Sequence, residues 1–371
     1  MTKEQLEYFA KLITNHSLSL KKGERVLIDI VGKPDEFIKV LVDYVYKAGA
    51  EPIIQYLPVS LLKSLIKSAN SDQFEFLAKH QMNLLESVDA YLGIREEENS
   101  FEFEDLSEEV YQLYVNKYVK PVQMKALGLE RWLLHKLPTA GMAQQAKLST
   151  EALDQLFFDS INMNYEEFSK SVKPLADLLS ATDKVRIVSP GTDLEFSIKG
   201  IPNFICDGKF NLPDGEIFTA PIVDSVEGVI TFNSPTSFLG KQYSDVKLEF
   251  SKGKVMNVSG NRKDDLVELL STDEGASRVG EFGIGLNPYI QQPTNHLCFD
   301  EKMAGSIHLA MGQCFYYASN GNESSIHIDF VLCQSKSLGG GELYFDGRLI
   351  RKDGMFVTSE LKHLNTGLRR D

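Results

Sequence analysis

The sequence predicts a two-domain α/β protein, with an N-terminal doubly wound parallel sheet followed by a strand-rich α+β domain. The chain has 371 residues, which is more than one hydrophobic core usually supports. Roughly its first 160 residues alternate between strand and helix patterns, as parallel β-α-β units do. From Asp183 onward the pattern changes to short strands separated by Gly, Asn and Pro.

The first half shows apolar runs typical of buried strands and amphipathic runs typical of helices. Four strands are expected, at 23–32, 51–57, 88–96 and 131–139. The expected helices lie at 35–50, closed by Gly49, at 58–87 with a break near Ser71, and at 106–122. A strand-helix alternation of this kind favours an open doubly wound sheet.

The second half begins after a helical segment at 153–182, which we expect to connect the two domains. Short strands follow at 183–191, 193–200, 226–233 and 246–258, the last folded at a Lys252-Gly253 turn, with one helix at 264–270. We therefore expect an N-terminal α/β domain over residues 1–183 and a strand-rich C-terminal domain over 184–371.

Composition excludes several functional classes. Hydrophobic residues make up 43% and charged residues 25%, as in globular proteins, and the net charge of −13 disfavours a nucleic-acid partner. The one short basic cluster lies at 368–370. No apolar run is long enough for a transmembrane helix, and the N-terminus has the pattern of an amphipathic helix rather than of a secretion signal. The four cysteines lack CxxC spacing, so we expect free thiols and a cytoplasmic protein.

The segment from Gly280 to Phe330 has the composition of a metal site. Carboxylates and histidines alternate there in an apolar, glycine-rich setting: Glu281, Glu301, His308, His327 and Asp329. Divalent ions such as zinc, cobalt and manganese accept imidazole nitrogen together with carboxylate oxygen. Several carboxylates are able to neutralise two cations rather than one.

Local patterns in this segment predict how its side chains point. SSIHIDFVL is typical of a strand, so His327 and Asp329 should project from the same face. SIHLAMGQ predicts a second strand, with His308 near its start, and the short loop SNGNES allows the two strands to lie close together.

Each of these residues also has an ordinary structural interpretation. Glu216, in the Pro-Asp-Gly turn upstream, is explained equally well as a turn residue. His308 alone would more often be a core histidine, glycine-flanked Glu281 an exposed turn residue, and Glu301, in Asp-Glu-Lys, a surface residue. The metal-site interpretation depends on their occurring together in one apolar segment, where unpaired charges are costly to bury.

Two other functions are compatible with the residues alone. His327 and Asp329 with one more histidine would make the two-histidine, one-carboxylate iron site of an oxygenase, with His363 downstream and Arg369 available for an oxo-acid. That interpretation leaves Glu216 and Glu281 unexplained and does not account for the β-α-β first half. A non-catalytic metal-binding module is the second alternative.

Ordered motifs along nearly the whole chain resemble the metallo-aminopeptidase family of aminopeptidases T and S (PepS). The matching stretches are WLLHKLPTAGMAQQA, NLPDGEIFTAP, GEFGIGLN, FDEKMAGSIHLAMGQ, SSIHIDFV and GELYFDGRLIRKDGMFV. The resemblance implies an enzyme that hydrolyses the N-terminal residue from peptides with a free N-terminus. It also implies a homodimer and two divalent ions that activate water, zinc or cobalt, with manganese or magnesium as further candidates.

The resemblance assigns roles to individual positions. The implied metal ligands are Glu216, Glu281, Glu301, His308, His327 and Asp329. Glu281 would also bridge or flank both ions and act in catalysis, with another carboxylate as the alternative for moving the proton. The family carries a catalytic tyrosine seven residues after its first ligand histidine, but that position is Phe315 here. We expect the adjacent Tyr316 to take the role. The alternatives are Tyr317 in that role and catalysis without a tyrosine.

Overall fold

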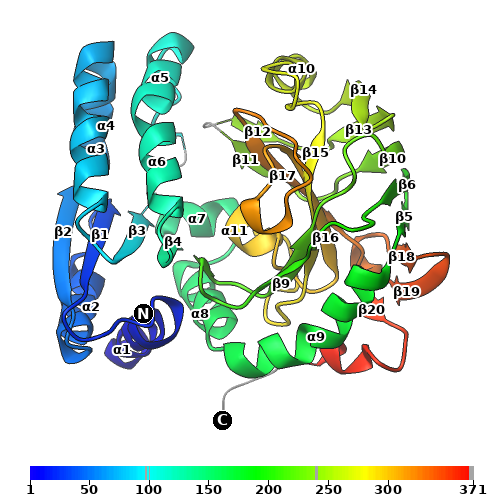
Figure 1. Cartoon of the computed structure of the whole chain (residues 1–371), viewed down its shortest axis with the longest axis horizontal. Coiled ribbons are helices and arrows are strands. Elements are labelled where there is room, and N and C mark those ends of the chain that lie inside the picture. The colour runs from blue at the N-terminus through cyan, green and yellow to red at the C-terminus, as the bar shows by residue number, and fades with distance from the viewer. Residues whose placement is uncertain (97, 100, 239–240, 367–371) are drawn as a thin grey trace. The chain divides into compact units, whose positions relative to one another are not determined.

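The computed structural model describes residues 1–96, 98–99, 101–238 and 241–366. The chain forms two compact units (Figure 1). The first contains Met1–Ile161 and Gly208–Leu212, and the second contains Asn162–Asp207 and the chain from Pro213 onward. The basic cluster at 368–370, which includes Arg369, lies outside the described residues.

The first unit is built on a five-stranded sheet in the order β2-β1-β3-β4-β8. Its strands are β1 (Arg25–Val31), β2 (Glu51–Leu57), β3 (Ala90–Glu96), β4 (Trp132–Leu137) and β8 (Asn211–Leu212). Every pairing is parallel. Since the strand order reverses direction at β1, this is the doubly wound sheet that the sequence predicts. The short fifth strand was not predicted, because β8 joins the sheet from a part of the chain far from the other four strands.

Helices cover this sheet. They are α1 (Lys3–Leu12), α2 (Asp35–Lys47), α3 (Val59–Ser68), α4 (Ser71–Leu85), α5 (Glu108–Tyr114), α6 (Lys120–Leu127), α7 (Ala140–Gln145) and α8 (Thr150–Ile161). The predicted break near Ser71 is confirmed, because the Asn70 side chain caps α4 by accepting the amide of Gln73. The helix expected over 106–122 is instead divided by a π-helical turn at Val115–Val119.

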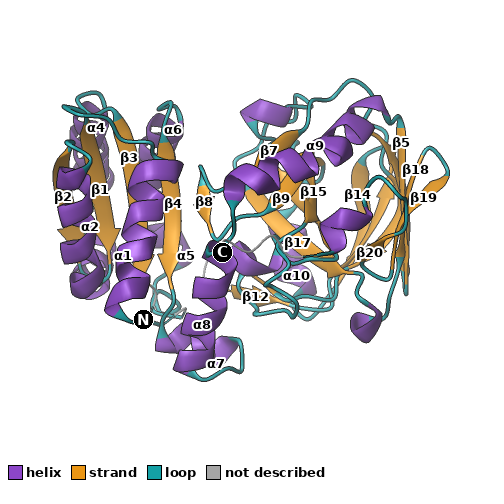
Figure 2. Cartoon of the chain, turned by 90° about the horizontal axis from the view of Figure 1, so that it is seen from below, coloured by secondary structure: helices purple, strands orange, loops and turns teal. Residues whose placement is uncertain are grey.

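The second unit contains an antiparallel five-stranded sheet in the order β17-β16-β15-β9-β7 (Figure 2). Its strands are β7 (Phe204–Cys206), β9 (Glu216–Thr219), β15 (Val279–Gly285), β16 (Ser306–Gly312) and β17 (His327–Cys333). β16 and β17 pair directly, as the short connecting loop predicted. We call this the site sheet, because it carries the candidate ligands described below.

One face of the site sheet is apolar. It packs through Phe282 and Phe330, whose rings lie 5.1 Å from Phe196 and 5.4 Å from Phe232. Phe196 belongs to an eight-stranded sheet, whose order is β14 (Lys254–Ser259), β13 (Lys247–Ser251), β10 (Glu227–Thr231), β6 (Thr192–Ser197), β5 (Lys184–Ser189), β18 (Glu342–Phe345), β19 (Arg348–Lys352) and β20 (Met355–Phe356). The strand-rich second half is therefore confirmed.

Shorter elements complete the second unit. A ribbon of β11 (Thr236–Phe238) and β12 (Lys241–Tyr243) is accompanied by α9 (Tyr165–Ala181), α10 (Lys263–Leu269) and α11 (Leu297–Asp300). The predicted turn between β13 and β14 has positive φ at both Lys252 and Gly253. A Cβ on Gly253 would lie 1.8 Å from the Val223 carbonyl oxygen, so only glycine fits there.

The helical segment expected over 153–182 is two helices. α8 ends the first unit at Ile161, and α9 belongs to the second unit, where it contacts β7. The compact units thus divide after Ile161, whereas the boundary expected from the sequence follows residue 183, at the end of α9. Residues 208–212 return to the first unit as β8, an excursion that a single boundary does not describe.

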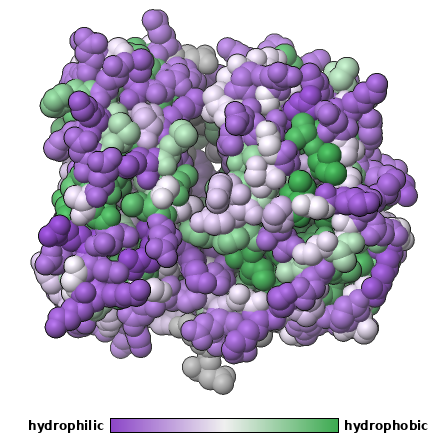
Figure 3. All heavy atoms as spheres, viewed as in Figure 1, coloured by the Kyte–Doolittle hydropathy of each residue, from purple (hydrophilic) through white to green (hydrophobic). Residues whose placement is uncertain are grey.

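Surface features agree with the composition. Hydrophilic side chains cover much of the face seen in Figure 3. Within the described ranges, no helix combines the length and the apolar character that crossing a bilayer requires. None of the four cysteines, all of which lie in the described ranges, forms a disulfide.

Candidate metal centre

The candidate ligands project from the face of the site sheet opposite to its apolar face. Residues directly opposite each other in an antiparallel pair share a face, and so do residues two apart in one strand. Glu281 lies opposite Ala310, which lies opposite Asp329, and His308 lies opposite Gly283. Glu216 lies opposite Gly285, and His327 lies opposite Gly312. All five side chains therefore emerge on one side of four adjacent strands.

Small residues between the ligands leave room for them. A Cβ on Gly283 would lie 2.0 Å from Cε1 and 2.1 Å from Nε2 of the His308 ring. A Cβ on Gly285 would lie 2.3 Å from the Ser306 hydroxyl and from the Met303 carbonyl oxygen. Gly283 and Gly285 thus leave room for the site rather than form a turn. The interpretation of Glu281 as an exposed turn residue is wrong, since it is 4% exposed within β15.

Glu281 lies between the two histidines. His308 Nε2 is 3.1 Å from its Oε1, and His327 Nε2 is 3.9 Å from its Oε2. His327 Nε2 is also 3.5 Å from Asp329 Oδ2, as predicted for a pair on one strand face. On the other side, His308 Nε2 is 3.6 Å from Glu216 Oε2. Glu216, Glu281 and His308 offer ligand atoms that all lie within 4.8 Å of one another.

A backbone carbonyl orients the His327 ring. His327 Nδ1 lies 2.7 Å from the Gln313 carbonyl oxygen, which only accepts hydrogen bonds, so Nδ1 carries the proton and donates it. Nε2 is then left facing Asp329 and Glu281. A ligand histidine whose other nitrogen is held by a carbonyl is typical of metal sites.

Glu301 and Lys302 approach this cluster from the end of α11. The Asp300 carboxylate anchors them, because it accepts hydrogen bonds from the Ser234 hydroxyl, from the Thr294 amide and hydroxyl, and from the Asn295 amide. Lys302 is 2% exposed, and its Nζ lies 2.7 Å from Glu301 Oε1 and 2.6 Å from Glu216 Oε1. The interpretation of Asp-Glu-Lys as ordinary surface chemistry is therefore wrong.

Burial and charge shift the pKa values in this cluster. Burial alone would lower the pKa of His308, but the Glu216 and Glu281 carboxylates raise it to about 10. Burial also opposes the charge on Lys302, yet the surrounding carboxylates raise its pKa well above the usual range. The pKa values of Glu301 and Asp329 are raised, mainly by burial.

Unpaired atoms in the cluster fit a divalent metal. Glu216 Oε2, Glu281 Oε2 and His308 Nδ1 are buried without a hydrogen-bond partner in the described part of the chain. A buried carboxylate oxygen without a partner is costly, and a cation bound there would remove that cost. Carboxylate oxygens and imidazole Nε2 atoms are ligands that zinc, cobalt and manganese accept.

The aromatic residues after β16 lie beside His327. The Phe315 ring meets the His327 ring edge-on at 5.1 Å and the Phe218 ring at 5.7 Å. Tyr316 is 90% exposed and meets the Tyr317 ring edge-on, and Tyr317 stacks on Phe204. Phe315, at the position of the family tyrosine, therefore lies against a candidate ligand, whereas Tyr316 faces solvent.

Sequence reasoning missed Lys302, Asp214 and Cys206 at this site. Phe299, three residues before Lys302, and Met303, directly after it, are both fully buried. These apolar neighbours were the available signal that the helix end is internal.

A surface hollow of about 340 Å³ lies elsewhere, in the first unit. No titratable side chain lines it, so it is not an alternative candidate for a catalytic or metal-binding site. Its lining is Leu57, Leu61, Ser64, Leu65, Ser68, Ala69 and Gln73.

The oxygenase alternative required a further histidine such as His363. Its Nε2 lies 2.8 Å from the Ser171 carbonyl oxygen, so this nitrogen donates a hydrogen bond to the backbone. The structure thus gives His363 a partner outside the ligand cluster.

Comparisons with known proteins identify the family of the chain. A family model described as thermophilic metalloprotease (M29) matches residues 2–356. Aminopeptidase PepS of Streptococcus thermophilus is 23% identical over 412 residues, covering 96% of each chain. Aminopeptidase AmpS of Bacillus subtilis (strain 168) is 23% identical over 410 residues, 95% of this chain and 96% of its own. Aminopeptidase T of Thermus aquaticus is 32% identical over 166 residues, 40% of this chain and 38% of its own.

A solved structure shows the same fold. Wild-type AmpT from Thermus thermophilus superposes with a TM-score of 0.80 at 22% identity, over 96% of this chain and 100% of that one. The family match covers most of the sequence and does not support an oxygenase. The resemblance to aminopeptidases T and S is thereby confirmed, and the chain belongs to the M29 family of metalloproteases.

Proposed function

We propose that this metalloprotease is an aminopeptidase that removes the N-terminal residue from peptides at a two-ion metal centre. The observation that carries the proposal is the position of Glu281, with one carboxylate oxygen toward His308 and the other toward His327. A carboxylate between two histidines is suited to bridge two cations. The activities of PepS, AmpS and aminopeptidase T, as their names state them, support the substrate class.

The ligands divide into two sets that share Glu281. Glu216, Glu281 and His308 would hold one ion, and Glu281, His327 and Asp329 the other. Glu301 Oε1 and Glu216 Oε1 contact the same ammonium, at 2.7 and 2.6 Å from Lys302 Nζ, so Glu301 lies beside the first ligand set and would serve as the sixth ligand. Zinc or cobalt fits this donor set, with manganese or magnesium as further candidates.

The chain's own residues would divide the catalytic work. Bound divalent ions polarise a scissile carbonyl and lower the pKa of water. Glu281, or another carboxylate of the cluster, would accept the proton of the attacking water and deliver it to the departing amine. A carboxylate of the cluster would meet the free α-amine, which would restrict cleavage to the N-terminal residue. Tyr316 would donate a hydrogen bond to the oxyanion once a bound peptide covers its exposed side chain.

A homodimer and a cytoplasmic location complete the proposal. The dimer follows from the family resemblance, and analytical ultracentrifugation tests it, because a monomer at micromolar concentration would contradict it. Four cysteines that form no disulfide fit a reducing compartment.

The test is hydrolysis of leucine p-nitroanilide, compared with its N-acetylated counterpart. Chelator-treated protein is assayed before and after zinc, cobalt or manganese is restored, with Asp193→Asn on the surface of β6 as the control variant. Cleavage of the free-amine substrate alone, dependent on restored metal, is the expected result. Absence of cleavage despite two bound ions would overturn the proposed activity and leave a metal-binding module.

A further inference from the structure

A lysine ammonium lies inside the acidic part of the candidate metal centre. Lys302 Nζ is 2.6 Å from Glu216 Oε1, 2.7 Å from Glu301 Oε1 and 3.9 Å from Asp214 Oδ1. Asp214 is 0% exposed, and Glu216 is 4% exposed. The role proposed above for the metal ligands gives this lysine no task.

The same place has the donors of a second metal pocket. Cys206, Asp214 and Glu216 offer ligand atoms within 4.8 Å of one another, and all three residues are buried. Cys206 lies directly opposite Glu216 in the β7–β9 pair, so both side chains emerge on the ligand face of the site sheet. A thiolate with carboxylates is a donor set that zinc and cobalt accept. Glu216 thus belongs to two adjacent ligand sets.

Lys302 contacts only one of the two Glu216 oxygens that these ligand sets use. Its ammonium contacts Glu216 at Oε1, while Oε2 has no hydrogen-bond partner and faces His308 Nε2 at 3.6 Å. We propose that Lys302 is a tethered cation that fills the Cys206–Asp214–Glu216 pocket, excludes divalent ions from it, and directs Glu216 Oε2 toward the metal centre. Lys302 is thus a positioning residue.

The backbone around Lys302 holds the ammonium in place. The Lys302 carbonyl accepts a hydrogen bond from the Asn287 amide, and the Lys302 amide donates to the Phe299 carbonyl. The neighbouring Met303 carbonyl packs so closely on Gly285 that a Cβ there would approach it to 2.3 Å. A cation on a fixed support competes with a free ion without an entropy cost of association, so it is suited to exclude metal.

Cobalt(II) tests the proposal, because a cobalt–thiolate bond has a near-ultraviolet charge-transfer band that carboxylate and imidazole ligands lack. The four proteins are the wild type, Cys206→Ser, Lys302→Ala and the Lys302→Ala/Cys206→Ser double variant. Bound cobalt per folded chain is counted by elemental analysis, and folding is checked by circular dichroism. Cys333→Ser controls for a buried cysteine outside the pocket.

The expected result is one additional cobalt ion per chain in Lys302→Ala, with a thiolate band that disappears in the double variant. The Cys206 thiol loses its proton to the buffer as the cobalt–sulfur bond forms. A folded Lys302→Ala protein that binds no more cobalt than the wild type would overturn the proposal.

A second comparison decides the question if Lys302→Ala fails to fold. Wild type and Cys206→Ser should then give identical cobalt spectra, since the ammonium keeps the ion away from the thiol. A thiolate band in the wild type that Cys206→Ser lacks would mean that metal displaces Lys302, and would overturn the proposal. The readout counts ions and ligands rather than hydrolysis, so a failure of the proposed aminopeptidase activity leaves it unaffected.

Discussion

At the residue scale, His327 is held at one ring nitrogen and free at the other. The Gln313 carbonyl accepts the Nδ1 proton at 2.7 Å, and Nε2 faces the carboxylates of Asp329 and Glu281. The Gln313 carbonyl fixes the proton of His327 on Nδ1, so Nε2 is the nitrogen available to a metal ion. The His-x-Asp spacing predicted that the two side chains share a face, but the partner of Nδ1 comes from the preceding loop and had no sequence signal.

Replacing His327 or Asp329 by alanine tests the ligand assignment. Removing a residue that hydrogen-bonds to a metal ligand typically lowers metal affinity by roughly 10–100-fold. Each of these variants removes a ligand itself, so its metal affinity should fall by more than that. It should keep the native circular dichroism spectrum, because neither side chain packs in the apolar core. Isothermal titration with zinc measures the affinity, and wild-type affinity in both variants would contradict the assignment.

Substitutions at Phe315 and Tyr316 test whether Tyr316 donates a hydrogen bond to the oxyanion. Tyr316→Phe should lower kcat by about 10²–10³, the effect of losing one such donor, if the exposed tyrosine closes over the substrate. Phe315→Tyr restores a hydroxyl beside His327 in the Tyr316→Phe background. Steady-state kinetics on leucine p-nitroanilide measure both, with Tyr317→Phe as the control. An unchanged kcat in Tyr316→Phe would exclude Tyr316 as the donor.

At the scale of elements, the site depends on β15, whose glycine-rich sequence GEFGIGLN does not predict a strand. Strands rarely tolerate several glycines, because glycine gains no packing and loses conformational entropy. In β15 the glycines are needed because His308 and Ser306 of the next strand occupy the space where Cβ atoms would lie. Strand pairing, which is not local, thus overrides the weak local propensity for a strand.

Gly283→Ala tests this packing directly. The added methyl would overlap the His308 ring at 2.0 Å, so the ring must move away from Glu281. We expect a loss of about 1–3 kcal/mol in the free energy of unfolding, together with weakened zinc binding. Urea denaturation measures the free energy of unfolding. Gly128→Ala, where the nearest atoms are 3.4 Å away, is the matched control and should cost less.

At the scale of the whole molecule, the chain leaves the first unit after Ile161 and returns for Gly208–Leu212 before entering the second unit again. The returning segment is tied to β4 through His135, whose Nδ1 donates to the Leu212 carbonyl at 2.6 Å. The ring packs between Phe9 and Phe157, and its Nε2 is buried without a hydrogen-bond partner among the described residues. Burial lowers the pKa of His135 to about 4, although the Leu212 hydrogen bond partly opposes the shift.

This histidine predicts acid sensitivity of the first unit. Below pH about 6.5 the unfolded chain binds a proton at this position, whereas the folded chain does not until pH about 4. Stability should therefore fall as the pH drops through this window, by about 1.4 kcal/mol per pH unit.

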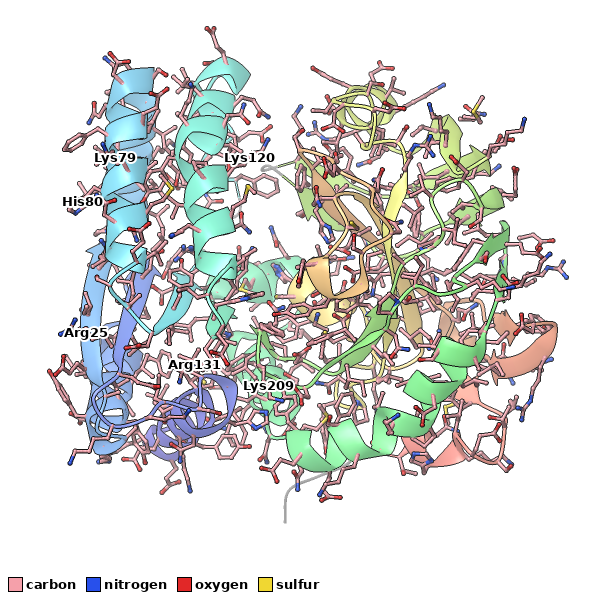
Figure 4. The ribbon with its side chains drawn as sticks, viewed as in Figure 1. Arg25, Lys79, His80, Lys120, Arg131 and Lys209 are labelled. Carbon is pink, nitrogen blue, oxygen red and sulfur yellow. The ribbon has the colours of Figure 1, made fainter. Side chains whose placement is uncertain are left out.

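Urea unfolding of the wild type and of His135→Gln at several pH values checks this. The variant should be less stable at neutral pH, because its packing changes. Between pH 6.5 and 4 its free energy of unfolding should fall less steeply with decreasing pH than that of the wild type, by the contribution of one proton. His80→Gln is the control, since His80 is exposed on α4 (Figure 4). Equal slopes in wild type and His135→Gln would contradict the assignment.

The sequence by itself determined the doubly wound first half, the strand-rich second half and the candidate ligands. These follow from local periodicity, which sets which side chains share a face, and from motifs of specific chemistry. Glu281, His308, His327 and Asp329 were identifiable without coordinates because they lie on two-residue alternations or inside long ordered motifs.

Only the tertiary structure decided which charges meet. The separation of Glu216 from Lys302 along the chain gives no sign that their side chains touch, because the contact depends on β9 pairing with β15 and on α11 packing over the site sheet. The position of β8 was settled in the same way. Apolar neighbours of Asp300 and Lys302 indicate that this turn is buried, but long-range strand pairing assigns the partners of its charged groups, and that pairing is not encoded in the neighbouring residues.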